Sequence, residues 1–177
     1  YLDTNKVLER LSSSHTRFIA IYDQEALDSL EAVFSKYGKR IAGIVTEAPT
    51  NPILQTIDMQ YLRDACDQLD ALIIIDPTVS SLSNVDVSPY ADIIVTSLTK
   101  YAGNQGDVLM GALIAGIERP WSEIWLEDAL EYIEPPHFTD CARLAAQIGD
   151  WQTVSDSINQ NTRRLAAYLE NHKAIAK

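Results

Sequence analysis

The chain has 177 residues, of which 46% are hydrophobic and 22% are charged. These fractions are those of an ordinary globular domain with a sizeable core, and they exclude intrinsic disorder. The 25 acidic side chains outnumber the 14 basic ones and give a net charge of −11, so neither nucleic acid nor an anionic membrane is expected as the main partner.

Helices and strands alternate in the first half of the sequence. The β-branched and aromatic run RFIAIY indicates a strand, and Gly38 provides the stop signal for the helix that follows it. Two prolines mark a loop over residues 47–52. The predicted elements are, in order, a helix over 4–11, a strand over 17–22, a helix over 24–37 and a strand over 41–46.

The second half continues this alternation and then becomes helical. The run ALIII, directly before Asp76, is continuously apolar, which is typical of a strand buried on both faces. We expect a helix over 57–69 and strands over 71–75, 92–96 and 108–115. The last stretch, of about sixty residues, is expected to be helical, with breaks near 134–136 and 149–150.

This order of elements predicts an α/β fold with a mainly parallel sheet, because strands that alternate with helices form right-handed βαβ units. Ligands bind beyond the carboxyl ends of such strands. The signatures of Rossmann dehydrogenases, P-loop enzymes and α/β-hydrolases do not occur. Two cysteines and three histidines show no metal-ligand or disulfide spacing, so no metal is expected and a reducing compartment is favoured.

Polar residues follow three of the predicted strands. Asn51 lies in EAPTNP, Asp76 begins DPT 25 positions later, and Lys100 lies in SLTKY a further 24 positions on. Each interval is one α/β repeat, so these residues are expected at one edge of the sheet. A partly desolvated lysine can form a Schiff base with an aldehyde, and a carboxylate can keep a pyridine nitrogen protonated. With the hydroxyls of Ser97 and Thr99 for a phosphate, the pattern predicts a pyridoxal 5'-phosphate site.

Residues 47–111 resemble the Cys/Met-metabolism family of pyridoxal-phosphate enzymes, which includes cystathionine γ-synthase, cystathionine γ- and β-lyases, methionine γ-lyase and O-acetylhomoserine sulfhydrylase. That family carries E-x-P-x-N-P, D-x-T and S-x-T-K-Y in this order and at nearly these spacings, followed by a glycine-containing turn that ends in Asp. The resemblance implies the large cofactor domain of fold type I (aspartate-aminotransferase-like), with pyridoxal 5'-phosphate as cofactor.

The resemblance also implies a role for each candidate residue. Lys100 is the catalytic residue, which forms the Schiff base and shuttles protons. Asp76 pairs with the pyridine nitrogen. The other implied cofactor contacts are those of Ser97 and Thr99 with the phosphate, of Asn51 near the ring hydroxyl and the substrate carboxylate, and of Thr78 along the ring.

The implied reaction is a β- or γ-elimination or replacement on a sulfur amino acid or an activated homoserine. It would be carried out by a cytoplasmic lyase or transferase that is a homodimer or homotetramer, with a small amino acid as its substrate. Members of the family are much longer, so this chain is interpreted as a fragment. Residues 1–150 would be the second half of the large domain, and 151–177 a helix leading toward a C-terminal small domain.

A non-catalytic α/β module, or an inactive fragment of such an enzyme, remains the alternative. Pro77 stands where the family usually has Asn, and the turn 104–107 reads NQGD where the family has a Gly-His-Ser-Asp type of sequence. Of the R-M-x-x-H-x-x-N pattern in the late helix, only Asn161 is kept. The resemblance places a Gly-Met phosphate-binding turn and a ring-stacking Tyr upstream of this segment, so Ser97 and Thr99 would hold only part of the phosphate. The isolated chain is therefore expected to bind the cofactor weakly and to show no turnover.

Overall fold

The computed structural model describes residues 2–11, 19, 24–116 and 120–175. The chain divides into two compact units, Tyr1–Ala42 and Gly43–Lys177. The first unit holds the helices α1 (Leu2–Leu11) and α2 (Gln24–Tyr37) and the 3-10 turn η1 (Gly38–Arg40). Both predicted helices are confirmed, and α2 ends at Tyr37, directly before Gly38, whose φ of +52° suits a residue without a side chain. Apart from Ile19, the strand predicted over 17–22 lies outside the described residues.

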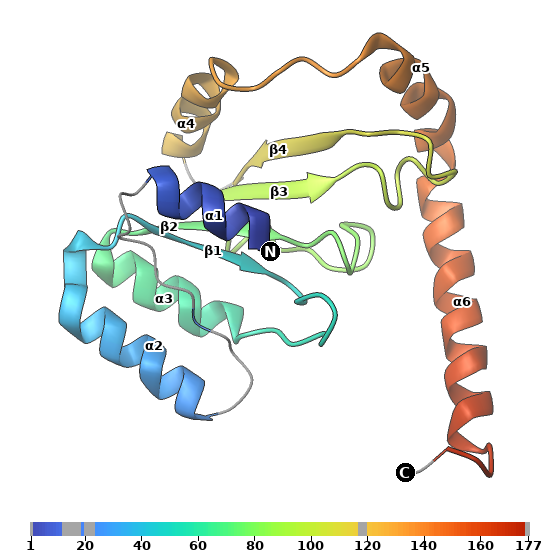
Figure 1. Cartoon of the computed structure of the whole chain (residues 1–177), viewed down its shortest axis with the longest axis horizontal. Coiled ribbons are helices and arrows are strands. Elements are labelled where there is room, and N and C mark those ends of the chain that lie inside the picture. Colours follow the sequence, from blue (N-terminus) through green and yellow to red (C-terminus); the bar gives the residue numbers. More distant parts are fainter. Residues whose placement is uncertain (1, 12–18, 20–23, 117–119, 176–177) are drawn as a thin grey trace. The chain divides into compact units, whose positions relative to one another are not determined.

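The second unit is built on a four-stranded sheet with the order β1-β2-β3-β4 (Figure 1). Its strands are β1 (Gly43–Glu47), β2 (Leu72–Asp76), β3 (Ile93–Ser97) and β4 (Gly111–Ala115). The first three strands are parallel, and β4 runs antiparallel to β3. The mainly parallel α/β sheet predicted from the sequence is confirmed.

Helix α3 (Met59–Leu69) connects β1 to β2 and supplies part of the core. It begins at Asp58, whose carboxylate accepts a hydrogen bond from the Tyr61 N–H at 3.0 Å and so caps the helix. Its apolar side buries Leu62 and Cys66. On β2, Ile73 and Ile75 are fully buried while their neighbours are half-buried. The ALIII strand is therefore completely covered on one face only, where the sequence predicted both.

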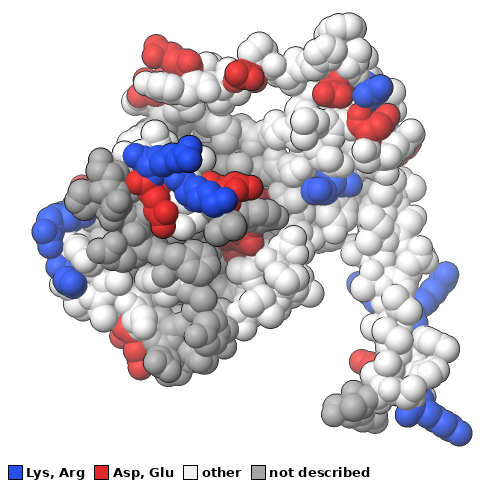
Figure 2. Space-filling view, in the orientation of Figure 1, with Lys and Arg blue, Asp and Glu red and all other residues white. Residues whose placement is uncertain are grey.

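The described residues after β4 are mainly helical, as predicted. Helices α4 (Pro120–Leu130), α5 (Phe138–Gln147) and α6 (Trp151–Glu170) are separated by the residues around 134–136 and by the 3-10 turn η2 (Ile148–Asp150). The charged residues of α4 are all acidic, and Figure 2 shows them as a red patch over this helix. No helix among the described residues is long and apolar enough to cross a bilayer.

A buried ion pair joins α3 to the amino end of β3. Arg63 donates from Nη1 to Asp92 Oδ2 at 2.8 Å, and both side chains are almost completely buried. The same Asp92 oxygen accepts from the Ile73 N–H at 2.7 Å, and its second oxygen accepts from Trp121 Nε1 at 3.3 Å. A second carboxylate, that of Asp67, contacts Arg63 Nη2 at 2.8 Å from the surface. The carboxylate of Asp92 thus links α3, β2 and α4 to the start of β3.

Candidate functional site

The polar segments singled out in the sequence meet at one edge of the sheet. Glu47 and Asp76 end the neighbouring strands β1 and β2 and are partners in their register. Ser97 ends β3, which is parallel to β2. The carboxyl ends of the three strands therefore bring together the loop after β1, the residues after Asp76 and the turn that carries Lys100.

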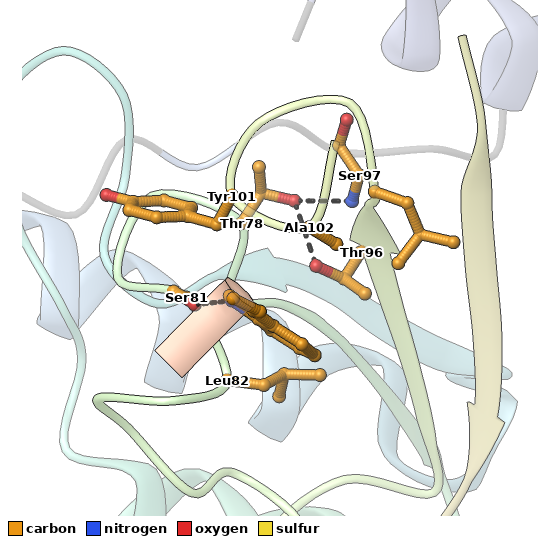
Figure 3. Close-up of a pocket in the computed structure, with 9 residues that line it drawn as sticks. Thr78, Ser81, Leu82, Thr96, Ser97, Tyr101 and Ala102 are labelled. Carbon is orange, nitrogen blue, oxygen red and sulfur yellow. Dashed lines mark hydrogen bonds between the residues drawn. The ribbon is translucent and has the colours of Figure 1, made fainter. Parts of the chain in front are cut away.

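Thr78 connects the ends of β2 and β3. Its N–H donates to Asp76 Oδ1 at 2.9 Å, and its hydroxyl oxygen accepts the Ser97 N–H at 2.9 Å (Figure 3). The same hydroxyl lies 3.4 Å from the hydroxyl of Thr96. These bonds fix the distance between the two strand ends, so Thr78 has a positioning role that the D-x-T motif alone did not predict.

The side chains of Asp76, Ser97 and Lys100 keep unused capacity for hydrogen bonding. Asp76 is half-buried and bonds within the described chain through Oδ1, which leaves Oδ2 available. Within the described chain, Ser97 is hydrogen-bonded through its backbone N–H and not through its hydroxyl. Lys100 is exposed and makes no ion pair with a described residue. The sequence predicted a partly desolvated lysine, whereas the side chain lies on the open turn after β3.

Thr99 differs from Ser97 in that its hydroxyl is engaged with the backbone. It lies 3.4 Å from the carbonyl oxygen of Met110, to which it donates, and 3.3 Å from the Met110 N–H, from which it accepts. Leu98 N–H also donates to the Met110 carbonyl at 2.9 Å. These contacts close the base of the loop 98–110. Because the Thr99 hydroxyl is already bonded to Met110, its contact with a phosphate stays a prediction.

Asn51 lies in an exposed loop that Glu47 holds in place. The Asn51 N–H donates to Glu47 Oε2 at 3.0 Å, and its own side chain is exposed. The loop is also tied to the residues after β2, because the Ser80 hydroxyl lies 3.1 Å from the Ala48 carbonyl oxygen. The sequence interpretation missed Ser80, which carries no local signal beyond being a serine in a turn.

A small cavity lies behind this edge, and nine residues line it: Thr78, Ser81, Leu82, Thr96, Ser97, Leu98, Tyr101, Ala102 and Trp151 (Figure 3). Its free space is about 10 Å³, roughly the room that one water molecule needs. A cofactor would therefore lie on the open edge outside it. The Tyr101 hydroxyl donates to the Val79 carbonyl at 2.9 Å, and Trp151 Nε1 donates to the Ser81 hydroxyl at 3.0 Å. Both bonds hold the residues that follow Asp76 in place, and both come from residues distant in the sequence.

Comparison with known proteins matches residues 1–177 to the family described as Cys/Met metabolism PLP-dependent enzyme. The chain belongs to this family. It is 34% identical over 175 residues to the L-2-amino-4-chloropent-4-enoate dechlorinase/desaturase of Streptantibioticus cattleyicolor, covering 99% of this chain and 35% of that protein. It is 28% identical over 177 residues to the cystathionine gamma-lyase of Bacillus subtilis, covering 99% of this chain and 44% of that protein.

Solved structures of Cys/Met-metabolism enzymes have the same fold. The cystathionine gamma synthase of Xanthomonas oryzae in complex with cystathionine superimposes with a TM-score of 0.73 at 21% identity, covering 100% of this chain and 45% of that one. A cystathionine gamma-lyase from Micromonospora echinospora gives a TM-score of 0.78 at 19% identity, with coverage of 100% and 46%. The chain thus spans less than half the length of these relatives.

These findings confirm three predictions and leave others open. The family, the fold type I architecture and the family's dependence on pyridoxal phosphate are as predicted from the sequence. The roles of the six candidate residues and the division into 1–150 and 151–177 stay predictions.

The groups left available at the sheet edge fit the cofactor of this family. Pyridoxal phosphate presents an aldehyde, a pyridine nitrogen and a phosphate. The edge offers an exposed amine on Lys100, a free carboxylate oxygen on Asp76 and a hydroxyl on Ser97. The amine can react with the aldehyde, the carboxylate can accept the pyridinium proton, and the hydroxyl can donate to the phosphate.

Proposed function

We propose that these residues form the lysine-bearing part of the active site of a cytoplasmic lyase or transferase. The reaction is a β- or γ-elimination or replacement on a sulfur amino acid or an activated homoserine, in a protein that is a homodimer or homotetramer. The observation that supports this most directly is the amine of Lys100, which lies on the turn after β3 at the same sheet edge as the half-buried carboxylate of Asp76.

Each side chain has a defined role in this proposal. When bound, pyridoxal phosphate supplies an electron sink for the negative charge that develops on the substrate's α-carbon. Lys100 Nζ would hold the cofactor covalently until the substrate's amino group displaces it, and the freed amine would then carry the proton removed from the α-carbon. Asp76 Oδ2 accepts a hydrogen bond from the protonated pyridine nitrogen, and the Ser97 hydroxyl donates to the phosphate. Thr78 keeps these two strand ends at a fixed separation.

The test uses the complete natural polypeptide that includes these 177 residues. Mixed with pyridoxal phosphate, it is expected to develop the visible absorption of a lysine–cofactor linkage, and borohydride reduction should fix the label on Lys100. Lys100→Ala should abolish both signals, while Lys39→Ala, which removes another exposed lysine, should change neither. A label that persists on the Lys100→Ala protein would overturn the assignment.

A non-catalytic module is the second candidate, because the hydroxyls of Thr99 and Tyr101 are engaged with the backbone, which leaves only the Ser97 hydroxyl of the segment SLTKY available for the phosphate. The two candidates differ in turnover. An enzyme should release product from at least one of cystathionine, methionine and O-acetylhomoserine, and Lys100→Ala should abolish the release. A protein that binds the cofactor and turns over none of the three would favour the module.

A further inference from the structure

The loop 98–110, between β3 and β4, carries Lys100 and reaches across to α5 (Figure 1). At its base, Leu98 and Thr99 are hydrogen-bonded to Met110. Just past Lys100, the chain turns back sharply, because the Gly103 N–H donates to the Leu98 carbonyl at 2.6 Å. Lys100 therefore lies in a short turn, and the position of this turn depends on where the rest of the loop is held.

The middle of this loop packs on α5. Ala102 and Val108 are buried and form a small apolar cluster with Leu144 of α5. Gly103 fits tightly here, since a Cβ at this position would lie 2.9 Å from Val108 Cβ. Apolar packing is not directional, so this cluster brings the loop and the helix together without fixing how the loop is oriented.

Gln147, at the end of α5, supplies the directional contacts. Its side chain is nearly buried, with 5% of its surface exposed. Oε1 accepts the Gln105 N–H at 3.1 Å, and Nε2 donates to Asp107 Oδ1 at 2.8 Å. Its backbone carbonyl accepts from Asn104 Nδ2 at 3.4 Å. One amide thus binds both sides of the loop tip, and only one orientation of its oxygen and nitrogen satisfies both bonds.

A second contact to the tip is weaker. Arg143, also on α5, donates to the Asp107 carbonyl at 3.0 Å and lies 3.6 Å from its carboxylate. Both side chains are about half exposed, so water screens this ion pair. Gln147 is nearly buried, and an amide there that loses its partners remains unpaired. The position of the tip therefore depends on Gln147 more than on Arg143.

We propose that Gln147 is a positioning residue for Lys100: its buried amide holds Gln105 and Asp107, and through them the turn that carries the lysine. The inference rests on the proposed function, because it gives this contact a purpose only if Lys100 holds the cofactor. It assigns to α5 a part in the active site although α5 supplies none of the candidate cofactor contacts.

The isosteric change Gln147→Glu tests the inference most sharply. It replaces the donor Nε2 with a carboxylate oxygen that faces Asp107, so the loop tip is repelled without a change in side-chain volume. Combining it with Asp107→Asn restores a donor–acceptor pair with the two roles exchanged and the total charge kept. The matched control is Gln152→Glu on α6, where an exposed amide donates to Asp156 Oδ1 at 3.1 Å.

Two measurements on the complete natural polypeptide are needed. The first is amide hydrogen exchange over residues 103–107 without cofactor. The second is the rate at which pyridoxal phosphate becomes attached to Lys100, followed by borohydride quenching and peptide mass. Gln147→Glu should raise the exchange rate and lower the attachment rate, each by about tenfold, as for the loss of a hydrogen bond to a charged group. The double variant should recover most of both, and Gln152→Glu should change neither.

The outcomes separate this inference from the proposed function. Faster exchange with an unchanged attachment rate would overturn the inference and leave the proposed function intact, because the loop would then be held without consequence for the lysine. Failure of the double variant to recover attachment would also overturn it, since the effect would come from general destabilisation. If the unsubstituted protein is never labelled on Lys100, both the proposed function and this inference are wrong.

Discussion

Asp92→Ala should destabilise the protein more than any other single change to an acidic residue of the described chain. The carboxylate, which is 2% exposed, binds Arg63 at 2.8 Å and the Ile73 N–H at 2.7 Å. Its removal leaves a buried guanidinium with the surface carboxylate of Asp67 as its remaining acidic partner, and it leaves the Ile73 N–H without this acceptor.

The expected loss in unfolding free energy is about 4 kcal/mol, since breaking a buried ion pair from one side costs roughly 3–5 kcal/mol. Asp92→Asn keeps an oxygen for the Ile73 N–H and should cost about 2 kcal/mol, the value of a charged hydrogen bond. Asp67→Ala removes the other carboxylate, which is 49% exposed, and should cost less than about 1 kcal/mol.

Urea unfolding of the complete natural polypeptide and these variants measures the differences. The double variant Arg63→Met with Asp92→Asn provides the decisive comparison, because it removes both charges and keeps the acceptor. It should be more stable than Asp92→Ala, as is usual when a buried pair is replaced as a unit. If Asp92→Ala costs no more than Asp67→Ala, the buried pair does not stabilise the junction of α3 and β3.

Three further outcomes are expected. Gly103→Ala should lower stability by about 1–3 kcal/mol in urea unfolding, because its Cβ would meet Val108 at 2.9 Å, whereas Gly149→Ala, with nothing within 4 Å, should be neutral; equal effects would contradict the packing argument. Burial raises the pKa of the Cys66 thiol to about 11, so the stability it contributes should be lost as pH rises from about 8.5, where an unfolded thiol ionises, to 11. Cys66→Ala should remove that slope, and a Cys141→Ala control should keep it. The isolated 177 residues should elute from a sizing column as oligomers, because β4 and α4 expose apolar side chains; a monomer would refute this.

The main elements of the sheet unit could be predicted because their signals are local. An apolar run such as ALIII and a β-branched run ended by Ser97 each depend on neighbours within a few residues. The order of those elements then places Asp76 and Ser97 at the same edge, since parallel strands end together. The candidate site could thus be located from the pattern alone.

The contacts that fix the site could not be predicted, because each joins residues far apart in the sequence. Gln147 bonds to a loop about forty positions earlier, a separation that leaves no periodic signal. Trp151 donates to the Ser81 hydroxyl across a separation of 70 positions. The hydroxyl of Thr78 accepts the backbone N–H of Ser97, 19 positions later. In a turn, Ser and Thr have several possible partners, and only the packed structure selects one.

The two ends of the five-residue strand β3 have different roles: one end carries a buried ion pair that stabilises the fold, and the other carries the groups available for a ligand. At its amino end, both Asp92 oxygens are hydrogen-bonded and the side chain is buried, so this carboxylate contributes to folding and has nothing left for a ligand. At its carboxyl end, the Ser97 hydroxyl has no bond within the described chain, and Lys100 is exposed. Because unpaired polar groups are costly when buried, groups available for a ligand must lie where water can reach them until the ligand binds. The buried ion pair at the amino end of the strand then anchors β3, and the reactive groups lie at its other end.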